Sequence, residues 1–385
     1  MKICILTPRF PFPENGGDVL RINNVARYLK AQGHSLCLVS FAPPKPDLSE
    51  AAKLYDSIYY VVFSKIKAYF FSFIYYLIGK PMQCGYYYSA TFMRVLREVI
   101  EKERPDKYVA HLLRMTPYLE RLGLQQQSIV EMTDALSKTY ALAEKAKGGG
   151  VMKWIYKLEQ QRIQQYEMWV TKTFPKVVLV SQTDVAYLQA LCPLAQSLVF
   201  KTNGVKSLPE YPTTYDNNKI CFVGNMRTLQ NQDAVFHFVK QVFPLILQHQ
   251  PNAVFYIIGS EPPAKIKALA SEHVVVTDFV EDIQGAIQDS CVMVAMVSIA
   301  AGIQNKVLVA MGCGIPVVLT SLIAQAIPEL KNTENAIVAD TIDEIANAIL
   351  DLMANSVKRN AIGHAGYKMV KQHYTWEAKL HDYDK

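Results

Sequence analysis

The sequence predicts an α/β fold with two doubly wound parallel sheets, and three observations lead to this prediction. The chain has 385 residues, of which 50% are hydrophobic and 19% charged, and this suits two globular domains. Strand-like apolar runs alternate with helical patterns in both halves. A polar, proline-containing connector at 206–218 separates the halves. We expect Rossmann-like domains at 1–205 and 219–374, and a tail at 375–385 that packs toward the N-terminal domain.

The first half opens with a β-α-β pattern. A buried strand at 2–7 leads through a long proline-rich loop to a helix at 19–32, and a second strand follows at 35–41. The loop has no GxGxxG, which disfavours a dinucleotide-binding oxidoreductase. Further strands are expected at 56–63, 107–112, 128–133 and 176–181, and helices at 90–103, at 114–122, after 150 and up to 191.

The second half repeats the alternation of strands and helices. Its expected strands are 219–224, 253–259, 274–280, 292–297, 315–320 and 335–339, and its expected helices are 231–248, 263–271 and 342–374.

The stretch AGIQNKVLVAMGCGIPVV at 301–318 predicts a helix that starts beside the carboxyl edge of a strand. Val307, Ala310 and Met311 recur at helical spacing and are expected to face inward. The first-turn N–H groups are unpaired and the helix dipole makes that end positive, so the helix start is suited to an anion. Lys306 adds a full positive charge there. A phosphate is the expected occupant; the alternative is an ordinary helix start with a solvated lysine.

This stretch resembles the nucleotide-sugar site of family-4 retaining glycosyltransferases with the two-domain GT-B architecture, more narrowly their exopolysaccharide branch. The matching residues are Gly302, Gln304, Asn305, Lys306, Val307, Leu308, Ala310, Met311, Gly314, Pro316, Val317 and Val318. Two positions depart from the family, which has glutamate where this chain has Ala301 and Val309. The glutamate missing at 309 is the group expected to accept hydrogen bonds from the donor's ribose.

Other segments resemble the same family in the same order along nearly the whole chain. They are Asn203-Gly204-Val205, Gly224-Asn225-Met226-Arg227, Phe279 to Ile283 and Tyr374-Thr375-Trp376. The resemblance implies a GT-B fold whose two domains face each other across a cleft, with the donor held by the C-terminal domain. The donor-binding residues that it implies are Asn203, Gly224, Asn225, Val280, Gly302, Ile303, Gln304, Asn305 and Val309, together with the cations Arg227 and Lys306.

The first loop of the N-terminal half is a second candidate for ligand contact. Gly16 and Gly17 allow backbone to approach a ligand, and Arg21 is expected to point at it from one turn into the helix. The alternative is a plain turn and a surface arginine. The pattern "P-P-GGD-R" also resembles the family's first loop, in which glycines face the donor diphosphate and the acceptor.

Two polar residues at strand ends are candidates for contact with the transferred sugar. His111 and Asp134 end strands, and open sheets bind ligands at the carboxyl edge. The alternatives are a structural histidine and a helix-capping aspartate. The resemblance implies a polar or histidine residue from this region against the sugar, and we expect His111 first and Asp134 second.

The segment 61–97 contains many aromatic residues, five basic residues and no acidic residue. Basic residues beside an aromatic helix are typical of a segment that lies on anionic lipid; an internal aromatic cluster or an acceptor groove is the alternative. The basic residues are too dispersed for a nucleic-acid phosphate track.

The cellular setting expected from the sequence is the cytoplasm. Seven cysteines without a CxxC motif predict a reducing compartment, with neither disulfides nor a zinc site. No secretory signal is visible, and no apolar run reaches the roughly 20 residues that span a bilayer. The expected location is therefore cytoplasmic, with peripheral contact to the inner face of the plasma membrane through 61–97.

The expected function is transfer of a hexosyl unit from a nucleotide-diphosphate sugar to a saccharide or lipid-linked saccharide acceptor. Arg227 and Lys306 would stabilise the leaving diphosphate without a metal, and no cofactor is expected. The triplet Asp382-Tyr383-Asp384 is interpreted as incidental rather than as a metal-binding DxD. Two alternatives stay open: a catalytically inactive GT-B scaffold that acts as a binding partner, favoured by Ala301 and Val309, and a nucleotide-sugar epimerase.

Overall fold

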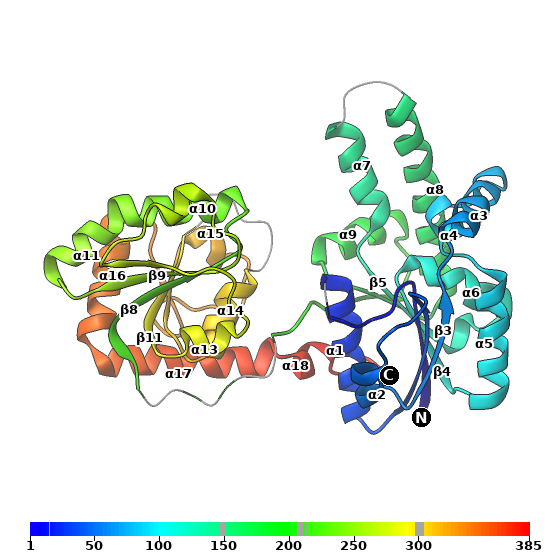
Figure 1. Ribbon diagram of the computed structural model, residues 1–385, viewed down its shortest axis with the longest axis horizontal. Coiled ribbons are helices and arrows are strands. Elements are labelled where there is room, and N and C mark those ends of the chain that lie inside the picture. Colours follow the sequence, from blue (N-terminus) through cyan, green and yellow to red (C-terminus); the bar gives the residue numbers. More distant parts are fainter. Residues whose placement is uncertain (15, 147–150, 206–208, 210, 212–213, 297–303) are drawn as a thin grey trace. The chain divides into compact units, whose positions relative to one another are not determined.

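The fold is known from a computed structural model, which describes residues 1–14, 16–146, 151–205, 209, 211, 214–296 and 304–385 (Figure 1). The chain forms two compact units. The first contains Met1–Asn203 and Leu380–Lys385, and the second contains Gly204–Lys379. Residues 375–379 of the expected tail thus belong to the second unit, and only the last six residues belong to the first.

The first unit is built on a seven-stranded parallel sheet with the order β3-β2-β1-β4-β5-β6-β7. Its strands are β1 Lys2–Thr7, β2 Ser35–Ala42, β3 Ser57–Val62, β4 Lys107–His111, β5 Ser128–Thr133, β6 Lys176–Leu179 and β7 Leu198–Phe200. Its helices include α1 Gly17–Ala31, α2 Ser49–Leu54, α3 Lys65–Leu77, α4 Met82–Tyr86, α5 Ala90–Glu103, α6 Thr116–Leu122, α7 Leu136–Ala146, α8 Val151–Thr173 and α9 Gln182–Leu191.

Burial of both sheet faces explains why these strands read as continuous apolar runs. Cys4 and Leu6 of β1 pack in one core cluster with Phe92 and Leu96 of α5. The alternate residue Ile5 is also fully buried, although it points to the other face. A parallel strand covered on both sides needs apolar residues at every position.

The second unit is built on a six-stranded parallel sheet with the order β10-β9-β8-β11-β12-β13. Its strands are β8 Asp216–Val223, β9 Val254–Ile258, β10 Val274–Val276, β11 Ser290–Ala295, β12 Val317–Leu319 and β13 Ile337–Val338. Its helices are α10 Leu229–His237, η3 Phe238–Val242, α11 Phe243–His249, α12 Ala264–Lys267, α13 Ile283–Ile287, α14 Asn305–Gly312, α15 Ser321–Ala324, α16 Ile342–Ala354 and α17 Ser356–His373. Two doubly wound parallel sheets confirm the predicted fold class.

One expected helix is divided by a proline. The sequence predicts a single helix over 231–248, but Phe238–Val242 is a π-helical turn between α10 and α11. Pro244 lacks an N–H group, and its ring would clash with the carbonyl of Lys240 in a regular α-helix. The wider π turn relieves that clash within an otherwise continuous helical segment.

Each sheet has one point where the chain reverses the direction in which it adds strands. In the first unit this switch point lies between β1 and β4, and in the second it lies between β8 and β11. The loops that leave the two strands diverge there to opposite faces of the sheet. Open α/β sheets bind ligands in the resulting crevice at the carboxyl edge.

The last residues of the chain are tied into the first unit. Tyr383 is fully buried. Lys176 Nζ donates to the backbone oxygens of Asp382 and Tyr383, at 2.8 and 2.9 Å. Asp384 bonds through its carboxylate to His34 Nε2, at 2.8 Å. The Asp-Tyr-Asp triplet therefore has structural contacts of its own.

All seven cysteines are free and buried, as expected for small core residues. Among the helices that the structure describes, none combines the length and hydrophobicity needed to cross a membrane. No group of three or more histidine, cysteine or acidic residues in the described ranges is arranged to hold a metal ion.

Candidate functional site

The switch point of the second unit begins with the loop after β8. Gly224 N donates to Ile258 O of β9 at 3.0 Å. A Cβ on Gly259 would lie 1.8 Å from Gly224 O, and one on Gly224 would lie 2.6 Å from Asn231 Nδ2. Glycine is therefore required at both positions, because backbone and an amide side chain pack directly against them.

Asn231 links this loop to the next element of the site. Its Nδ2 donates to Asn225 O at 2.9 Å, and its Oδ1 accepts from Lys306 Nζ at 2.6 Å. Asn225 is held in turn by an Asx turn, in which its Oδ1 accepts from Arg227 N at 2.9 Å. One amide side chain thus joins the loop after β8 to the first turn of α14.

Lys306 is a partly buried cation at the start of α14. Its ammonium group lies 4.4 Å from the centre of the Phe222 ring. Desolvation lowers the pKa of Lys306 to about 8. Within the described residues no carboxylate forms an ion pair with Lys306, so the amide oxygen of Asn231 and the Phe222 ring are the contacts that offset its burial.

The first turn of α14 has backbone donors but no side-chain cap. Gln304 is its N-cap, with extended backbone and no capping bond. Asn305 is exposed, whereas Val309 is half-buried and packs against the core of the unit. Val309 therefore presents only apolar surface at the position where the sequence resemblance led us to expect a glutamate. Gly302 and Ile303, also expected at this site, lie outside the described residues.

Arg227 and Val280 lie on loops at the same sheet edge, after β8 and β10, the two strands that flank β9. Arg227 follows β8, is largely exposed and pairs with Glu261, which follows β9. This pair is solvent-accessible and so worth little in stability, which leaves Arg227 free to exchange partners. Val280, after β10, is half-buried against the core.

The first loop of the N-terminal unit contributes to an ion pair that the sequence analysis did not predict. Arg9 pairs with Asp18 in the first turn of α1. Gly16 has a φ of +112°, and a Cβ there would lie 2.8 Å from Arg9 Nη2. Gly17, by contrast, has open space around it. Gly16 is thus needed for its positive φ, since the tip of the Arg9 side chain could move away from a Cβ.

Arg21 does not point at an open site, and this corrects the expectation for it. Its guanidinium is buried and pairs with the buried Glu131, with Nε to Oε1 at 3.2 Å. It also donates to Thr202 O at 2.9 Å and to Asn203 Oδ1 at 3.4 Å. The helical spacing placed Arg21 on the loop-facing side of α1, but a carboxylate on β5 receives its charge. Asn203, which was expected to contact the donor, accepts a hydrogen bond from this buried guanidinium.

His111 ends β4 at the switch point of the first unit. It is 2% exposed, and neither ring nitrogen has a hydrogen-bond partner among the described residues. Burial lowers the pKa of His111 to about 3, so its ring is neutral near pH 7. An unpaired buried imidazole at a sheet edge is costly for folding, so His111 stays the first candidate for contact with the transferred sugar.

Asp134 follows β5, after Thr133 with a φ of 71°. Asp134 is exposed, and among the described residues its side chain forms no helix-capping hydrogen bond. Partial burial of the carboxyl and the nearby Asp184 raise the pKa of Asp134. His111 and Asp134 thus lie on the carboxyl ends of adjacent strands, because β4 pairs with β5.

An aromatic cavity of about 320 Å³ adjoins the β1 loop. It is lined by Pro8, Arg9, Phe10, Phe12, Phe41, Ala42, Pro43, Phe63 and Tyr87. Aromatic walls with one guanidinium can stack on sugar rings or hold an apolar chain.

Residues 217–355, which lie in the second unit, match the family model of glycosyl transferases group 1. No curated protein matches the chain by sequence.

Solved structures show the same two-unit fold over almost the full chain. Anabaena HepE, in complex with UDP, has a TM-score of 0.60 and 13% identity, and the match covers 98% of this chain and 97% of that one. A point mutant of S. aureus TarM, in complex with fondaparinux, α-GlcNAc-glycerol and UDP, has a TM-score of 0.61 and 10% identity, covering 100% and 99%. WaaG, a glycosyltransferase involved in lipopolysaccharide biosynthesis, has a TM-score of 0.54 and 14% identity, covering 98% and 97%. The chain therefore has the GT-B fold that the sequence resemblance implied.

Proposed function

We propose that this protein is a retaining, metal-independent glycosyltransferase. It moves a hexosyl unit from a nucleotide-diphosphate sugar to a saccharide or lipid-linked saccharide acceptor in surface polysaccharide synthesis. The observation on which this rests most is the placement of Lys306. It is a desolvated cation without an acidic partner in the described chain, oriented by Asn231 at the β8/β11 switch point.

The second unit supplies what a diphosphate leaving group needs. Lys306 and the start of α14, where no side chain caps the first-turn N–H groups, offer positive charge and hydrogen-bond donors. Gly224 lets the backbone after β8 approach the phosphates, and Arg227 can leave Glu261 to fork onto them. These groups are fixed before reaction, so they stabilise charge that develops as the glycosidic bond to phosphate breaks.

The proposed chemistry retains the anomeric configuration. The acceptor hydroxyl attacks carbon 1 of the sugar from the side that the diphosphate leaves, and a diphosphate oxygen takes the proton. His111, neutral and unpaired, would accept or donate a hydrogen bond to a sugar hydroxyl, and Asp134 would orient another. The two side chains position the sugar and need not transfer protons.

We infer the donor class from the ligands of similar solved structures, and the place of the acceptor from the aromatic cavity of the first unit. UDP is bound in the HepE and TarM structures, so a uridine nucleotide is the first donor to try. The aromatic cavity beside Arg9 would hold the acceptor.

One observation favours a second function, a catalytically inactive GT-B scaffold. Val309 packs against the core where a ribose-binding glutamate is expected, so the ribose loses the hydrogen bonds that a carboxylate would accept. Such a protein would bind a nucleoside diphosphate or a saccharide without turnover.

The two functions are separated by incubating the purified protein with UDP-sugars and oligosaccharide or lipid-linked acceptors, and following release of UDP and the glycosylated product. We expect transfer that falls about 10²-fold or more in Lys306→Ala and in His111→Ala. Lys331→Ala, an exposed lysine in the same unit as Lys306, is the matched control. UDP binding without product in any donor–acceptor pair would favour the scaffold.

A further inference from the structure

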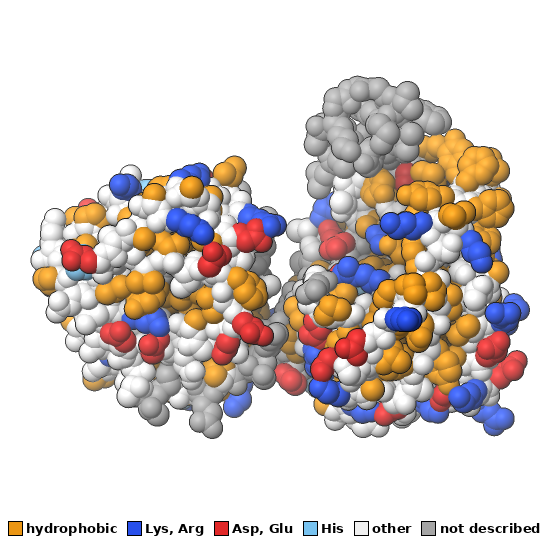
Figure 2. All heavy atoms as spheres, in the orientation of Figure 1, with side chains coloured by type: hydrophobic (Ala, Val, Ile, Leu, Met, Phe, Trp, Pro, Cys, Tyr) orange, Lys and Arg blue, Asp and Glu red, His pale blue; other side chains and the backbone are white. Residues whose placement is uncertain are grey.

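Helix α3 of the first unit, labelled in Figure 1, has an exposed apolar face. Its members are between 59% and 85% exposed: Ile66, Tyr69, Phe70, Phe73 and Leu77. At about 100° per residue, their spacing places all five on one side of the helix. Figure 2 shows the hydrophobic side chains gathered over this part of the molecule. A contiguous exposed patch of this kind marks an interaction surface.

The opposite side of α3 is already used for folding. Ala68 and Tyr75 are buried, and a Cβ on Gly85 of α4 would lie 2.7 Å from Tyr75 Cβ. The helix is therefore anchored through one face, and the five apolar side chains on the other face are left without a core. Folding alone does not account for them.

Two lysines border the apolar face. Helical geometry places Lys65 on one border and Lys67 on the other. Both are exposed, and neither pairs with a carboxylate among the residues that the structure describes. Positive charge in the first turn of a helix opposes the helix dipole, so these lysines do not serve helix stability.

The sequence around α3 contains no negative charge. From Ser57 to Arg97 there is no aspartate or glutamate. Lys80, which follows α3, is paired with Glu120, and Arg94 of α5 is paired with Glu98. Lys65 and Lys67 are the two cations on α3 itself. The partner must combine negative charge with an apolar interior.

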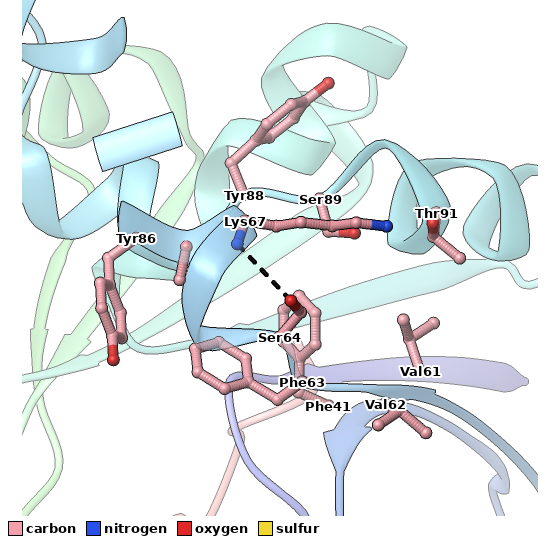
Figure 3. A pocket seen from close by; sticks show the side chains of 11 residues that line it. Phe41, Val61, Val62, Phe63, Ser64, Lys67, Tyr86, Tyr88, Ser89 and Thr91 are labelled. Atoms are coloured by element: carbon pink, nitrogen blue, oxygen red, sulfur yellow. Dashed lines mark hydrogen bonds between the residues drawn. The ribbon is translucent and has the colours of Figure 1, made fainter. Parts of the chain in front are cut away.

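A cavity of about 210 Å³ opens where α3 begins. Phe41, Phe63 and Tyr86 contribute aromatic walls, and Figure 3 shows Lys67 extending along it toward Thr91. The cavity shares Phe41 and Phe63 with the larger aromatic cavity beside the β1 loop. An apolar surface, a cation and two adjoining aromatic cavities thus occur together at one edge of this unit.

From these observations we infer that α3 docks on an anionic lipid surface, with Ile66, Phe70 and Phe73 inserted among the acyl chains and Lys65 and Lys67 at the headgroups. Aromatic residues and flanking lysines are the composition that favours a bilayer interface over a protein interface, in whose core lysine is depleted. Long lysine stems can lie along the apolar face while their charges reach the headgroups. Docking would bring a lipid-linked molecule to the edge that holds both aromatic cavities.

The test is flotation of the full-length protein with vesicles of phosphatidylcholine alone, or with about one quarter phosphatidylglycerol. We expect binding to the anionic vesicles that falls about tenfold or more in Phe70→Ser/Phe73→Ser. Lys65→Gln/Lys67→Gln should lose the preference for anionic vesicles. Leu194→Ser removes an even more exposed apolar side chain elsewhere in the same unit and should bind as wild type.

Two outcomes would overturn the inference. One is equal vesicle binding by wild type and Phe70→Ser/Phe73→Ser. The other is the absence of vesicle binding by the wild type. If light scattering then showed a dimer that requires Phe70 and Phe73, the apolar face would be assigned to contact with a second copy of the chain. UDP binding by each variant is measured alongside and should be unchanged, so failure of this inference is distinguishable from failure of the proposed function.

Discussion

Lys306 Nζ lies 2.6 Å from Asn231 Oδ1, and this bond joins the first turn of α14 to the loop after β8. The same asparagine donates to Asn225 O at 2.9 Å, so its orientation is fixed from both ends. Asn231 therefore positions a partly buried cation at the switch point of the second sheet.

Removing this positioning residue should weaken diphosphate binding without unfolding the protein. In Asn231→Ala, Lys306 loses its only described hydrogen bond, and we expect UDP affinity to fall about tenfold. Asn231→Asp would place a carboxylate against Lys306, raise its pKa and cancel its charge, so affinity should fall further. Calorimetric titration at several pH values measures both effects, and equal affinity in all three proteins would contradict this role.

The pH dependence of binding should report the lowered pKa of Lys306. Below about pH 8 the side chain is charged, and a diphosphate favours that form. UDP affinity should therefore decrease as the pH rises through about 8 toward the pKa of the bound form. Lys306→Arg stays charged over that range and should flatten this part of the profile. A wild-type profile as flat as that of the arginine variant would be inconsistent with a titrating Lys306.

The close contact between the loops after β8 and β9 predicts an intolerant glycine. In Gly259→Ala the new methyl group would lie 1.8 Å from Gly224 O, so the β8 loop must move. We expect a loss of about 1–3 kcal/mol in stability, together with weaker UDP binding. Gly79→Ala is the comparison, because its φ of +73° gives strain of about 1 kcal/mol in open space. Denaturant unfolding with a UDP titration tests this, and normal binding by Gly259→Ala would refute it.

The Arg21–Glu131 ion pair should affect the free energy of unfolding rather than ligand binding. Both side chains are fully buried, so Arg21→Met leaves a carboxylate without its cation and should cost about 3–5 kcal/mol. Burial raises the pKa of Glu131, while Arg21 opposes that rise. The double change Arg21→Met/Glu131→Leu should recover most of the loss, as measured by chemical denaturation. If Arg21→Met instead kept full stability and lost UDP binding, the original expectation of a ligand-facing Arg21 would be restored.

Strand positions could be predicted because parallel strands buried on both faces have unmistakable apolar runs. The strands Lys2–Thr7 and Ser128–Thr133 have the predicted bounds. The π turn before Pro244 was not predicted because the apolar periodicity of 231–248 continues through it, and the proline itself was the signal that could have revealed it.

The parts of the candidate site that follow from local sequence patterns could be predicted. The parts that depend on side-chain contacts between separate segments could not. The helix start at Lys306 follows from spacing, and Val307, Ala310 and Met311 are buried as expected. Three partner residues were not predicted: Asn231, Arg9 and Glu131. Their roles depend on contacts with Lys306, Asp18 and Arg21, and sequence patterns do not reveal these contacts. Asn231 lies shortly after the family-like segment Gly224-Asn225-Met226-Arg227, and this position is the signal that could have identified it.

The most direct test of the central claim is the dissociation constant of UDP measured by calorimetry for wild type, Lys306→Ala and the exposed-lysine control Lys331→Ala. A hydrogen bond to a charged group is worth about 1.5–3 kcal/mol, so Lys306→Ala should bind about 10- to 100-fold more weakly, with wild-type affinity in the control. Identical affinity in wild type and Lys306→Ala would show that the β8/β11 switch point does not hold the diphosphate.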